Sequence, residues 1–330
     1  MSAIITDLAG RLRLGRPASD GGLTIVPVFG EFPGAPLFVT LEEAMAANSL
    51  VITEVSEGGS VPTLKASNSG SVGVLILDGE ELAGAKQNRV LNTTVYIRPG
   101  QEIMIPVSCT EAGRWAYQSH DFDDSGYLAA KDIRVAANES VTGNLRMSLG
   151  FKSDQGRVWD EVGKLQVRHG RQSPTSAARD VYEHKAEDMR RREAAFACLP
   201  GQIGVVALWS GRVAGLDVIG SGKAYARLHG RLVRSYALDA PAGAPSQAPR
   251  DLQAAADWLA ALGRVQTTEH ESPGAGVSYR FTGAGVVGSA LAVDGAVLHA
   301  VALATQTQDA PVPDEGRYPG FFERRGHFPW

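Results

Sequence analysis

Residues 72–115 read VGVLILDGEELAGAKQNRVLNTTVYIRPGQEIMIPVSCTEAGRW, the clearest strand pattern in the chain. Apolar runs alternate here with turn-forming pairs: the runs are 72–77, 90–97 and 102–107, and the pairs are Asp78-Gly79 and Pro99-Gly100. Short apolar runs divided by glycine-containing turns are typical of consecutive antiparallel strands. Working outward from this stretch, we expect a protein built mainly from antiparallel sheet.

The same hairpin pattern occurs three times. The segments are GVLILDGEELAG at 73–84, GVVALWSGRVAG at 204–215 and SALAVDGAVLHA at 289–300. Tight turns need positive φ and half-buried strands need alternating apolar faces, so hairpin geometry explains whatever the three segments share. The polar residues peculiar to the first copy need another explanation, and they predict a functional site there.

Helices are expected mainly in the second half of the chain. A start signal at Ser173-Pro174 and a stop signal at Leu199-Pro200-Gly201 predict a helix over 173–199. Apolar spacing predicts two more, over 223–238 and 251–262. The fold class is therefore α+β, with mainly antiparallel sheets built from repeated hairpins and three main helices packed on them.

Other segments are less regular. Thr40 with Glu43 has the capping-box form and predicts a short helix. Residues 117–127 are polar and rich in turn formers, so we expect a loop. Residues 131–141 and 146–167 fit a strand or a helix, and the pattern does not choose between them.

Composition divides the chain into one main domain with two ends. Residues 1–22 carry mixed charge and are expected to form a loosely held arm, and residues 23–305 form the main domain. A proline-rich stretch at 240–250 marks a sub-boundary within it. The tail at 306–330 is rich in aromatic residues, so we expect it to dock on the body or on a second subunit, which would make a homo-oligomer.

Composition also excludes several classes of protein. Hydrophobic residues make up 44% and charged residues 21%, which is ordinary for a soluble globular protein. The formal charge of −4 argues against a protein that binds nucleic acid. No apolar run approaches the ~20 residues that span a bilayer, and the N-terminus lacks a signal-peptide core, so a cytoplasmic location without membrane contact is expected.

The two cysteines, Cys109 and Cys198, exclude a disulfide framework and a cysteine-rich zinc site. The histidines lack metal-binding spacing, and no metal site is predicted. Dinucleotide, phosphate-loop and hydrolase motifs are also missing at strand ends, so the sequence identifies no cofactor.

Polar residues crowd the central stretch. Those expected to bind a ligand are Lys86, Gln87, Asn88, Arg89 and Arg114. Amide and guanidinium groups gathered at the entrance of a strand are suitable donors for carboxylate, phosphate or ribose oxygens. A small-molecule ligand is therefore expected. For the neighbouring carboxylates Glu80 and Glu81, the alternative is a solvated hairpin pair.

Three residues are candidates for catalysis. Glu80 and Glu81 are neighbours on a strand and point to opposite faces, so one of them, Glu80, is expected to act as acid or base, with Glu111 as the other candidate. Cys109 would be a nucleophile only if a nearby cation such as Arg114 lowered its pKa. The alternative for Cys109 is a small core residue.

With these residues laid out, the chain resembles a prokaryotic family, the ADP-ribosylglycohydrolase and rhodanese-phosphatase-superfamily-associated protein domain. The segments that carry the resemblance are DGEELAGAKQNRVLNTTV at 78–95, IPVSCTEAGRW at 105–115, VWDEV at 158–162, SPTSAARDVYE at 173–183 and GRVAGLDVIG at 211–220. The resemblance implies a setting in ADP-ribose or nucleotide metabolism. The matching positions are Glu80, Gln87, Asn88, Arg89, Cys109, Glu111 and Arg114.

Two hypotheses follow. The first is an enzyme or processing factor that acts on a phosphate- or ribose-bearing small molecule of nucleotide or ADP-ribose type. The second is a non-catalytic binding or assembly protein in which the same polar cluster forms a structural network.

Overall fold

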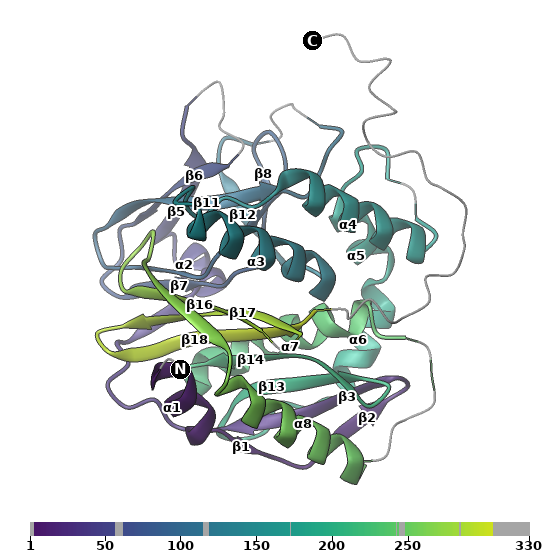
Figure 1. Ribbon diagram of the computed structural model, residues 1–330. Helices are drawn as coiled ribbons and strands as arrows, with labels where there is room; N and C mark the ends of the chain where they lie inside the picture. Colours follow the sequence, from purple (N-terminus) through teal and green to yellow (C-terminus); the bar gives the residue numbers. More distant parts are fainter. Residues whose placement is uncertain are drawn as a thin grey trace.

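The structure is a computed structural model, and it describes residues 3–56, 62–114, 119–171, 173–241, 243, 248–283 and 285–305. Figure 1 shows a layered arrangement of helices and sheets. Mainly antiparallel sheets with helices packed on them confirm the predicted α+β class. The linker residues 242 and 244–247 and the tail at 306–330 lie outside the described residues.

The largest sheet has nine strands in the order β1-β3-β13-β14-β18-β17-β16-β15, with β2 paired to β3. Its strands are β1 (Arg13–Leu14), β2 (Ala18–Asp20), β3 (Leu23–Phe29), β13 (Gln202–Trp209), β14 (Arg212–Ile219), β15 (Gln266–Glu271), β16 (Val277–Gly283), β17 (Val286–Val293) and β18 (Ala296–Ala304). Neighbouring strands are antiparallel throughout. The predicted hairpins at 204–215 and 289–300 are confirmed as β13–β14 and β17–β18.

A six-stranded sheet forms the second layer, in the order β12-β8-β9-β11-β6-β5. Its strands are β5 (Leu50–Glu54), β6 (Thr63–Asn68), β8 (Glu80–Gly84), β9 (Arg89–Leu91), β11 (Glu102–Cys109) and β12 (Phe122–Leu128). Thr53 in β5 forms a bridge with Asp121, just before β12, so the two edges of the sheet meet. We call this sheet the curled sheet, because an edge-to-edge bridge requires it to bend round on itself.

A three-stranded sheet lies beside the curled sheet. Its strands are β4 (Phe38–Thr40), β7 (Gly73–Ile76) and β10 (Val95–Ile97), and β4 is parallel to β7. Alternate residues of β7 and β10, such as Val74 and Val95, enter the same apolar core as residues of the curled sheet, such as Ile52. The two sheets therefore share one core.

Five strands of the nine-stranded sheet, β3, β13, β14, β17 and β18, are buried on both faces over most of their length. In β13, Val205 and Ala207 pack on one side of the sheet, and Val206 and Leu208 pack on the other. Helices α1 and α8 cover the second side, and the first side faces α3, α7 and the curled sheet (Figure 1). Burial on both faces explains why these strands are nearly continuous apolar runs.

The helices are α1 (Ala3–Arg11), α2 (Leu41–Ala46), α3 (Lys131–Arg146), α4 (Gln155–Arg168), α5 (Ala178–His184), α6 (Ala186–Ala194), α7 (Gly222–Leu238) and α8 (Ala248–Leu262). Helices α7 and α8 confirm the predictions for 223–238 and 251–262. The capping box that precedes α2 is also confirmed, since Thr40 Oγ1 accepts from the Glu43 N–H and the Glu43 carboxylate accepts from the Thr40 N–H.

The prediction of one helix over 173–199 is wrong, because α5 and α6 are separate and begin later. The hydroxyl of Ser173 accepts from the Ala177 N–H within a turn. The chain then pairs with the end of β11: the Ala178 N–H donates to the Thr110 carbonyl, and the Gly113 N–H donates to the Thr175 carbonyl. These sheet-like bonds occupy the segment where the first helical turn was expected.

Helices α3 and α4 occupy the two segments that the sequence left open. The Asp154 side chain caps α4, and Val158, Val162 and Leu165 line its buried side. The buried side of α3 is partly polar, and it includes Arg134. Hydrophobic periodicity could not identify α3, because the face that it buries carries charged and amide groups.

The predicted N-terminal arm is wrong for the residues described. Helix α1 buries Ile5 and Leu8 against the nine-stranded sheet, and β1 and β2 pair with β3. The predicted loop at 117–127 is also wrong from Phe122 onward, where β12 pairs with β8. Strand β12 was missed because its middle residues are polar and only its ends are buried.

The first of the three predicted hairpins is not a hairpin. Strand β7 pairs with β10 and β4, whereas β8 pairs with β9 and β12. The Asp78-Gly79 turn therefore carries the chain from one sheet to another, and the Gly79 N–H donates to the Leu91 carbonyl instead of closing a ladder. A tight turn with positive φ serves both purposes, so the local pattern did not distinguish them.

Candidate functional site

Three strands of the curled sheet bring polar side chains together at one end of its interior. Leu91, Val107 and Ile52 are interior residues of β9, β11 and β5. Because side chains alternate along a strand, the residues two positions away, Arg89, Cys109 and Glu54, lie on the same interior face. We call these three side chains, together with Gln87, the Arg89 cluster.

Arg89 is at the centre of this cluster and is 0% exposed. Its Nη1 donates to Gln87 Oε1 at 2.8 Å and also to the Cys109 sulfur. Its Nη2 lies 3.6 Å from Glu54 Oε1, which is an ion pair too long to be a hydrogen bond. The structure thus brings three of the predicted residues together with one that was not predicted.

Glu54 is the residue that sequence reasoning missed. It is 9% exposed, and neither carboxylate oxygen has a hydrogen-bond partner among the described residues. Its signal was present in the alternation of β5, where Leu50 and Ile52 point inward and Glu54 takes the next inward position. A charged residue at an inward position is the kind of exception that indicates a site.

Cys109 is held as a neutral thiol. Burial raises the pKa of Cys109 to about 11, although the Arg89 guanidinium opposes this. The Gln155 side chain also pairs with the Cys109 backbone, accepting from its N–H and donating to its carbonyl, both at 2.8 Å. The geometry therefore favours the alternative of a core cysteine over the expected nucleophile.

A second group lies beside the Arg89 cluster and contains Asn88, Glu111 and Arg114. Glu111 Oε2 accepts from Arg114 Nε at 2.9 Å and Nη2 at 2.7 Å, and from the Asn88 N–H at 3.2 Å. Burial acts to raise the pKa of Glu111, but these hydrogen bonds outweigh it and lower the pKa. Glu111 is an anion that holds Arg114, which does not fit a role as general acid.

Arg114 and Lys86 complete the neighbourhood of this group. Arg114 Nη1 donates to the Ala85 carbonyl at 2.8 Å, and Nη2 lies 3.3 Å from Asn88 Oδ1. Lys86 is buried in the same segment of chain. The predicted ligand-binding residues thus lie near one another, and most of the donors that are described here already contact protein acceptors.

Glu80 belongs to a different network. Its Oε2 accepts from the Leu77 N–H at 2.8 Å, and its Oε1 lies 3.2 Å from Arg231 Nη1 on α7. Arg231 also binds Asp124 and Glu42. Burial raises the pKa of Glu80 to about 7, although Arg231 acts to lower it. Glu80 therefore joins the curled sheet to α7 and does not converge with Arg89 or Glu111.

Glu81 lies on the opposite face of β8, as strand alternation predicts. Thr110 Oγ1 donates to its Oε1 at 2.9 Å, while Oε2 is buried without a hydrogen-bond partner among the described residues. Burial raises the pKa of Glu81 to about 7. Both neighbouring glutamates are buried, because helices and strands cover both faces of the curled sheet here.

A further buried network was not predicted at all. Arg134 on α3 binds Asp217 on β14 with two hydrogen bonds, and its Nη2 lies 3.5 Å from Asp78 Oδ1. His299 on β18 and Tyr236 on α7 also contact Asp217. The second hairpin copy, which looked plain in the sequence, thus carries the residue at the centre of this network.

The network joins two layers of the fold. Asp78 lies in the turn that leads into the curled sheet, and Asp217 lies on the nine-stranded sheet. Burial acts to raise the pKa of Asp217, but Arg134 and His299 lower it to about 2. The arrangement is that of a buried ion pair between layers.

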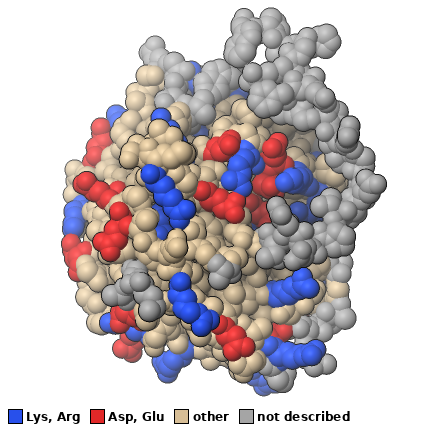
Figure 2. All heavy atoms as spheres, in the orientation of Figure 1, with Lys and Arg blue, Asp and Glu red and all other residues tan. Residues whose placement is uncertain are grey.

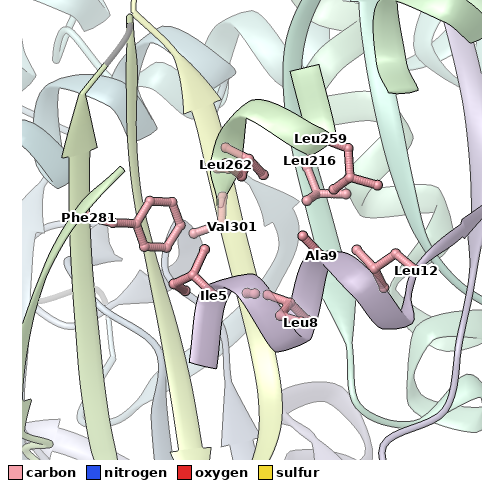
Figure 3. A pocket seen from close by; sticks show the side chains of 11 residues that line it. Ile5, Leu8, Ala9, Leu12, Leu216, Leu259, Leu262, Phe281 and Val301 are labelled. Carbon is pink, nitrogen blue, oxygen red and sulfur yellow. The ribbon is translucent and has the colours of Figure 1, made fainter. Parts of the chain in front are cut away.

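The pocket in Figure 3 is apolar and lies elsewhere, between α1, α8 and the nine-stranded sheet. Ile5, Leu8, Leu259 and Phe281 are among the side chains that line it, and its volume is about 10 Å³, room for one water molecule at most. It is a packing defect and not a ligand site. In the ranges that the structure covers, no three His, Cys, Asp or Glu residues are grouped as metal ligands.

Charges of both signs are interspersed over the face of the molecule shown in Figure 2, where no extended basic patch is present. No helix in the described part of the chain has the length and apolar character needed to cross a membrane.

Comparison with known proteins gave one match. Neither a curated protein nor a solved structure matches the chain. The family model for the ARG and Rhodanese-Phosphatase-superfamily-associated Protein domain, ARPP-1, matches residues 11–303. Since the match covers most of the chain, including the Arg89 cluster and both networks, the protein belongs to the ARPP-1 family.

Proposed function

We propose that this protein binds a ribose-bearing small molecule, of nucleotide or ADP-ribose type, at the Arg89 cluster, as a binding or processing factor. The observation that carries the proposal is the Glu54 carboxylate, which is buried in the curled sheet without a hydrogen bond among the described residues. A carboxylate accepts about four hydrogen bonds, and leaving a buried one without donors is unfavourable. Two adjacent ribose hydroxyls are neutral donors that can bind the two oxygens of one carboxylate.

The neighbours of Glu54 support the same ligand class. Arg89 lies 3.6 Å from Glu54, and Gln87 accepts a hydrogen bond from the same guanidinium. A hydroxyl group could therefore donate to the carboxylate while its oxygen accepts from the guanidinium. Cys109 adds a small, uncharged side chain to the cluster. The proposal concerns binding: Glu111 is paired with Arg114 and Glu80 with Arg231, so neither is assigned to a reaction.

The experiment is a thermal-shift panel of ADP-ribose, AMP, ribose 5-phosphate and the matched 2-deoxyribose compounds. We expect the ribose compounds to raise the Tm of the wild type and the deoxy compounds to do so less. Glu54→Gln removes the charge and keeps the shape. Because a charged acceptor is lost, the variant should need at least about ten times more ligand for the same rise in Tm. A wild type that responds to no compound, or a variant that responds equally, contradicts the proposal.

A second candidate is a non-catalytic assembly protein whose polar groups serve as a structural network. It is favoured by the way in which Arg231 and Arg134 connect α7, α3 and the sheets. In that case Glu80→Gln and Asn88→Ala should lower the free energy of unfolding by ~1–3 kcal/mol, the cost of leaving a buried partner unsatisfied. Unchanged urea midpoints for both variants would exclude this candidate, and a ligand response that depends on Glu54 would favour the first.

A further inference from the structure

A second polar region lies between α3 and the edge of the nine-stranded sheet, away from the Arg89 cluster. Arg280 on β16 points toward α3, which Figure 1 shows lying along this part of the sheet. It is 1% exposed, and its Nη1 donates to Asn138 Oδ1 at 3.0 Å. The Phe151 ring packs 5.5 Å from the centre of the guanidinium.

Most of the hydrogen-bonding capacity of Arg280 is unused. Nε and Nη2 are buried and have no hydrogen-bond partner among the described residues. These two atoms form the side edge of the guanidinium, the edge that holds two oxygens of a carboxylate or a phosphate at once. Burying three N–H groups without acceptors is costly, so the geometry calls for an acceptor at this edge.

The surroundings of Arg280 are hydroxyl-rich and basic. Thr142 lies one turn after Asn138 on α3, and its buried hydroxyl also has no hydrogen-bond partner among the described residues. Arg146, a further turn along α3, donates to Thr282 Oγ1 at 2.7 Å. Thr282 lies two residues after Arg280 on β16 and so shares its face of the sheet.

The adjacent strand adds a histidine. Thr268 on β15 is the direct partner of Arg280, and it contacts His270 at 2.9 Å. Burial lowers the pKa of His270, and the charge of Arg280 lowers it further. His270 is therefore a neutral group near Arg280, whose positive charge has no carboxylate in direct contact among the described residues.

No carboxylate neutralises this region directly. Within the described ranges, neither Arg280 nor Arg146 forms an ion pair, and the acidic group that acts on Arg280 is Asp78, reached through Asn138. Burial lowers the pKa of Arg280 to about 10. Arg134, by contrast, has Asp217 as a bidentate partner, and its pKa is raised. Of these two buried arginines, Arg134 is neutralised by a carboxylate in direct contact and Arg280 is not.

We propose that Arg280, Arg146, Thr142 and Thr282 form an anion site that holds a phosphate group, with two phosphate oxygens on the Nε and Nη2 edge of Arg280. Two guanidinium groups and two hydroxyls, without a carboxylate, suit a doubly charged oxyanion better than a singly charged one. The exposed Arg146 and the half-exposed Thr282 and His270 form the side that is open to solvent.

The site is independent of the proposed function, because it shares no residue with the Arg89 cluster. Inorganic phosphate and a phosphate monoester are the two sources of such a group, and the test separates them. Calorimetric titration in a phosphate-free buffer uses inorganic phosphate in one arm and glycerol 3-phosphate, a monoester without ribose, in the other. We expect binding in at least one arm, and tighter binding of inorganic phosphate if the site admits only the free ion.

Three variants and a control make the test specific. Arg280→Gln removes the charge, Arg280→Lys keeps the charge but lacks the two-nitrogen edge, and Arg146→Gln alters an exposed residue and should fold normally. Each should weaken phosphate binding about tenfold or more, whereas Arg191→Gln, an exposed arginine on α6, should leave it unchanged. Circular dichroism checks the fold of each variant.

The proposal is overturned if the wild type binds neither compound at millimolar concentration, which would mean that water alone occupies the Arg280 edge. It is also overturned if Arg146→Gln and both Arg280 variants bind as tightly as the wild type. Should the Arg280 variants fail to fold, Arg146→Gln decides, since undiminished binding by that variant contradicts the site as described.

Discussion

Arg134 and Asp217 form a fully buried bidentate ion pair, with Nη1 3.0 Å from Oδ2 and Nη2 2.6 Å from Oδ1. The two residues are 83 positions apart in the sequence. They join α3 to the nine-stranded sheet. Asp78, in the turn before the curled sheet, also lies close to Arg134. The contact between the curled sheet and the nine-stranded sheet thus includes two buried carboxylates, Asp78 and Asp217, that share the guanidinium of Arg134.

Breaking this pair should destabilise the protein strongly. Arg134→Gln leaves Asp217 as a buried charge without its cation, and we expect the free energy of unfolding to fall by about 3–5 kcal/mol. Urea denaturation followed by circular dichroism measures the change. Arg191→Gln, which breaks an exposed ion pair with Asp188, is the matched control and should leave the urea midpoint unchanged. Equal midpoints for the wild type and Arg134→Gln would contradict the role assigned to the pair.

The same pair should make the free energy of unfolding depend on pH in the acid range. The pKa of Asp217 is lowered from 3.8 to about 2 in the folded protein. The unfolded chain therefore binds more protons between these values, and the stabilisation by Asp217 is present above about pH 4 and lost as the pH falls toward 2. Asp217→Asn should flatten this part of the curve. The measurement is the urea midpoint at a series of pH values, and a slope equal to that of the wild type would contradict the expectation.

Glu81 should give the opposite dependence near neutral pH. Burial raises its pKa from 4.5 to about 7. The folded state then binds more protons between pH 4.5 and 7, so the stability contributed by protonated Glu81 is complete below about pH 4.5 and is lost as the pH rises through 7. Glu81→Gln mimics the protonated form and should be more stable than the wild type at pH 8, by on the order of 1–3 kcal/mol.

The comparison of Glu81→Gln with the wild type should be made at pH 5 and at pH 8. The two proteins should have similar stability at pH 5, because the wild-type carboxyl is then protonated. A variant that is less stable than the wild type at both pH values would show that the charge of Glu81 stabilises the fold, contrary to the argument from burial.

The two cysteines should differ in reactivity. Cys109 is buried with a pKa of about 11, whereas Cys198 is partly exposed. Because the thiolate is the reactive form, a thiol reagent at pH 8 should modify Cys198 in the native protein and Cys109 only after unfolding in urea. Mass spectrometry of digested protein assigns the sites. Rapid native modification of Cys109 would restore the hypothesis of a nucleophile.

Gln155 should stabilise the end of β11 through its amide group. Its side chain accepts from the Cys109 N–H and donates to the Cys109 carbonyl, in place of a neighbouring strand. Gln155→Leu removes both bonds and should lower the free energy of unfolding by about 1–3 kcal/mol. Gln253→Leu, on the exposed side of α8, is the control. An effect of Gln155→Leu no larger than that of the control would show that water replaces the amide at no cost.

Much of the fold was predictable from local patterns. Helix α7 and the hairpins β13–β14 and β17–β18 lie where apolar spacing and turn residues placed them, because those signals arise within a few residues of chain. Helix α3 was not predictable in this way, since it buries Arg134 and Asn138, whose partners come from distant segments. The Asp78-Gly79 turn had the local chemistry of a hairpin and a different tertiary role.

The candidate site shows the same division. The amino-acid order alone identified the polar stretch that contains Gln87, Arg89 and Cys109, because a crowd of polar residues on neighbouring strands is visible locally. The pairing of β9 with β11, which brings Cys109 to Arg89, is a tertiary contact. Only the tertiary structure placed Glu54 opposite Arg89 and moved Glu80 into a separate network with Arg231. The physical reason is that a charged side chain takes its partner from whichever strand or helix packs beside it, and that neighbour is chosen by the burial of apolar faces over the whole chain.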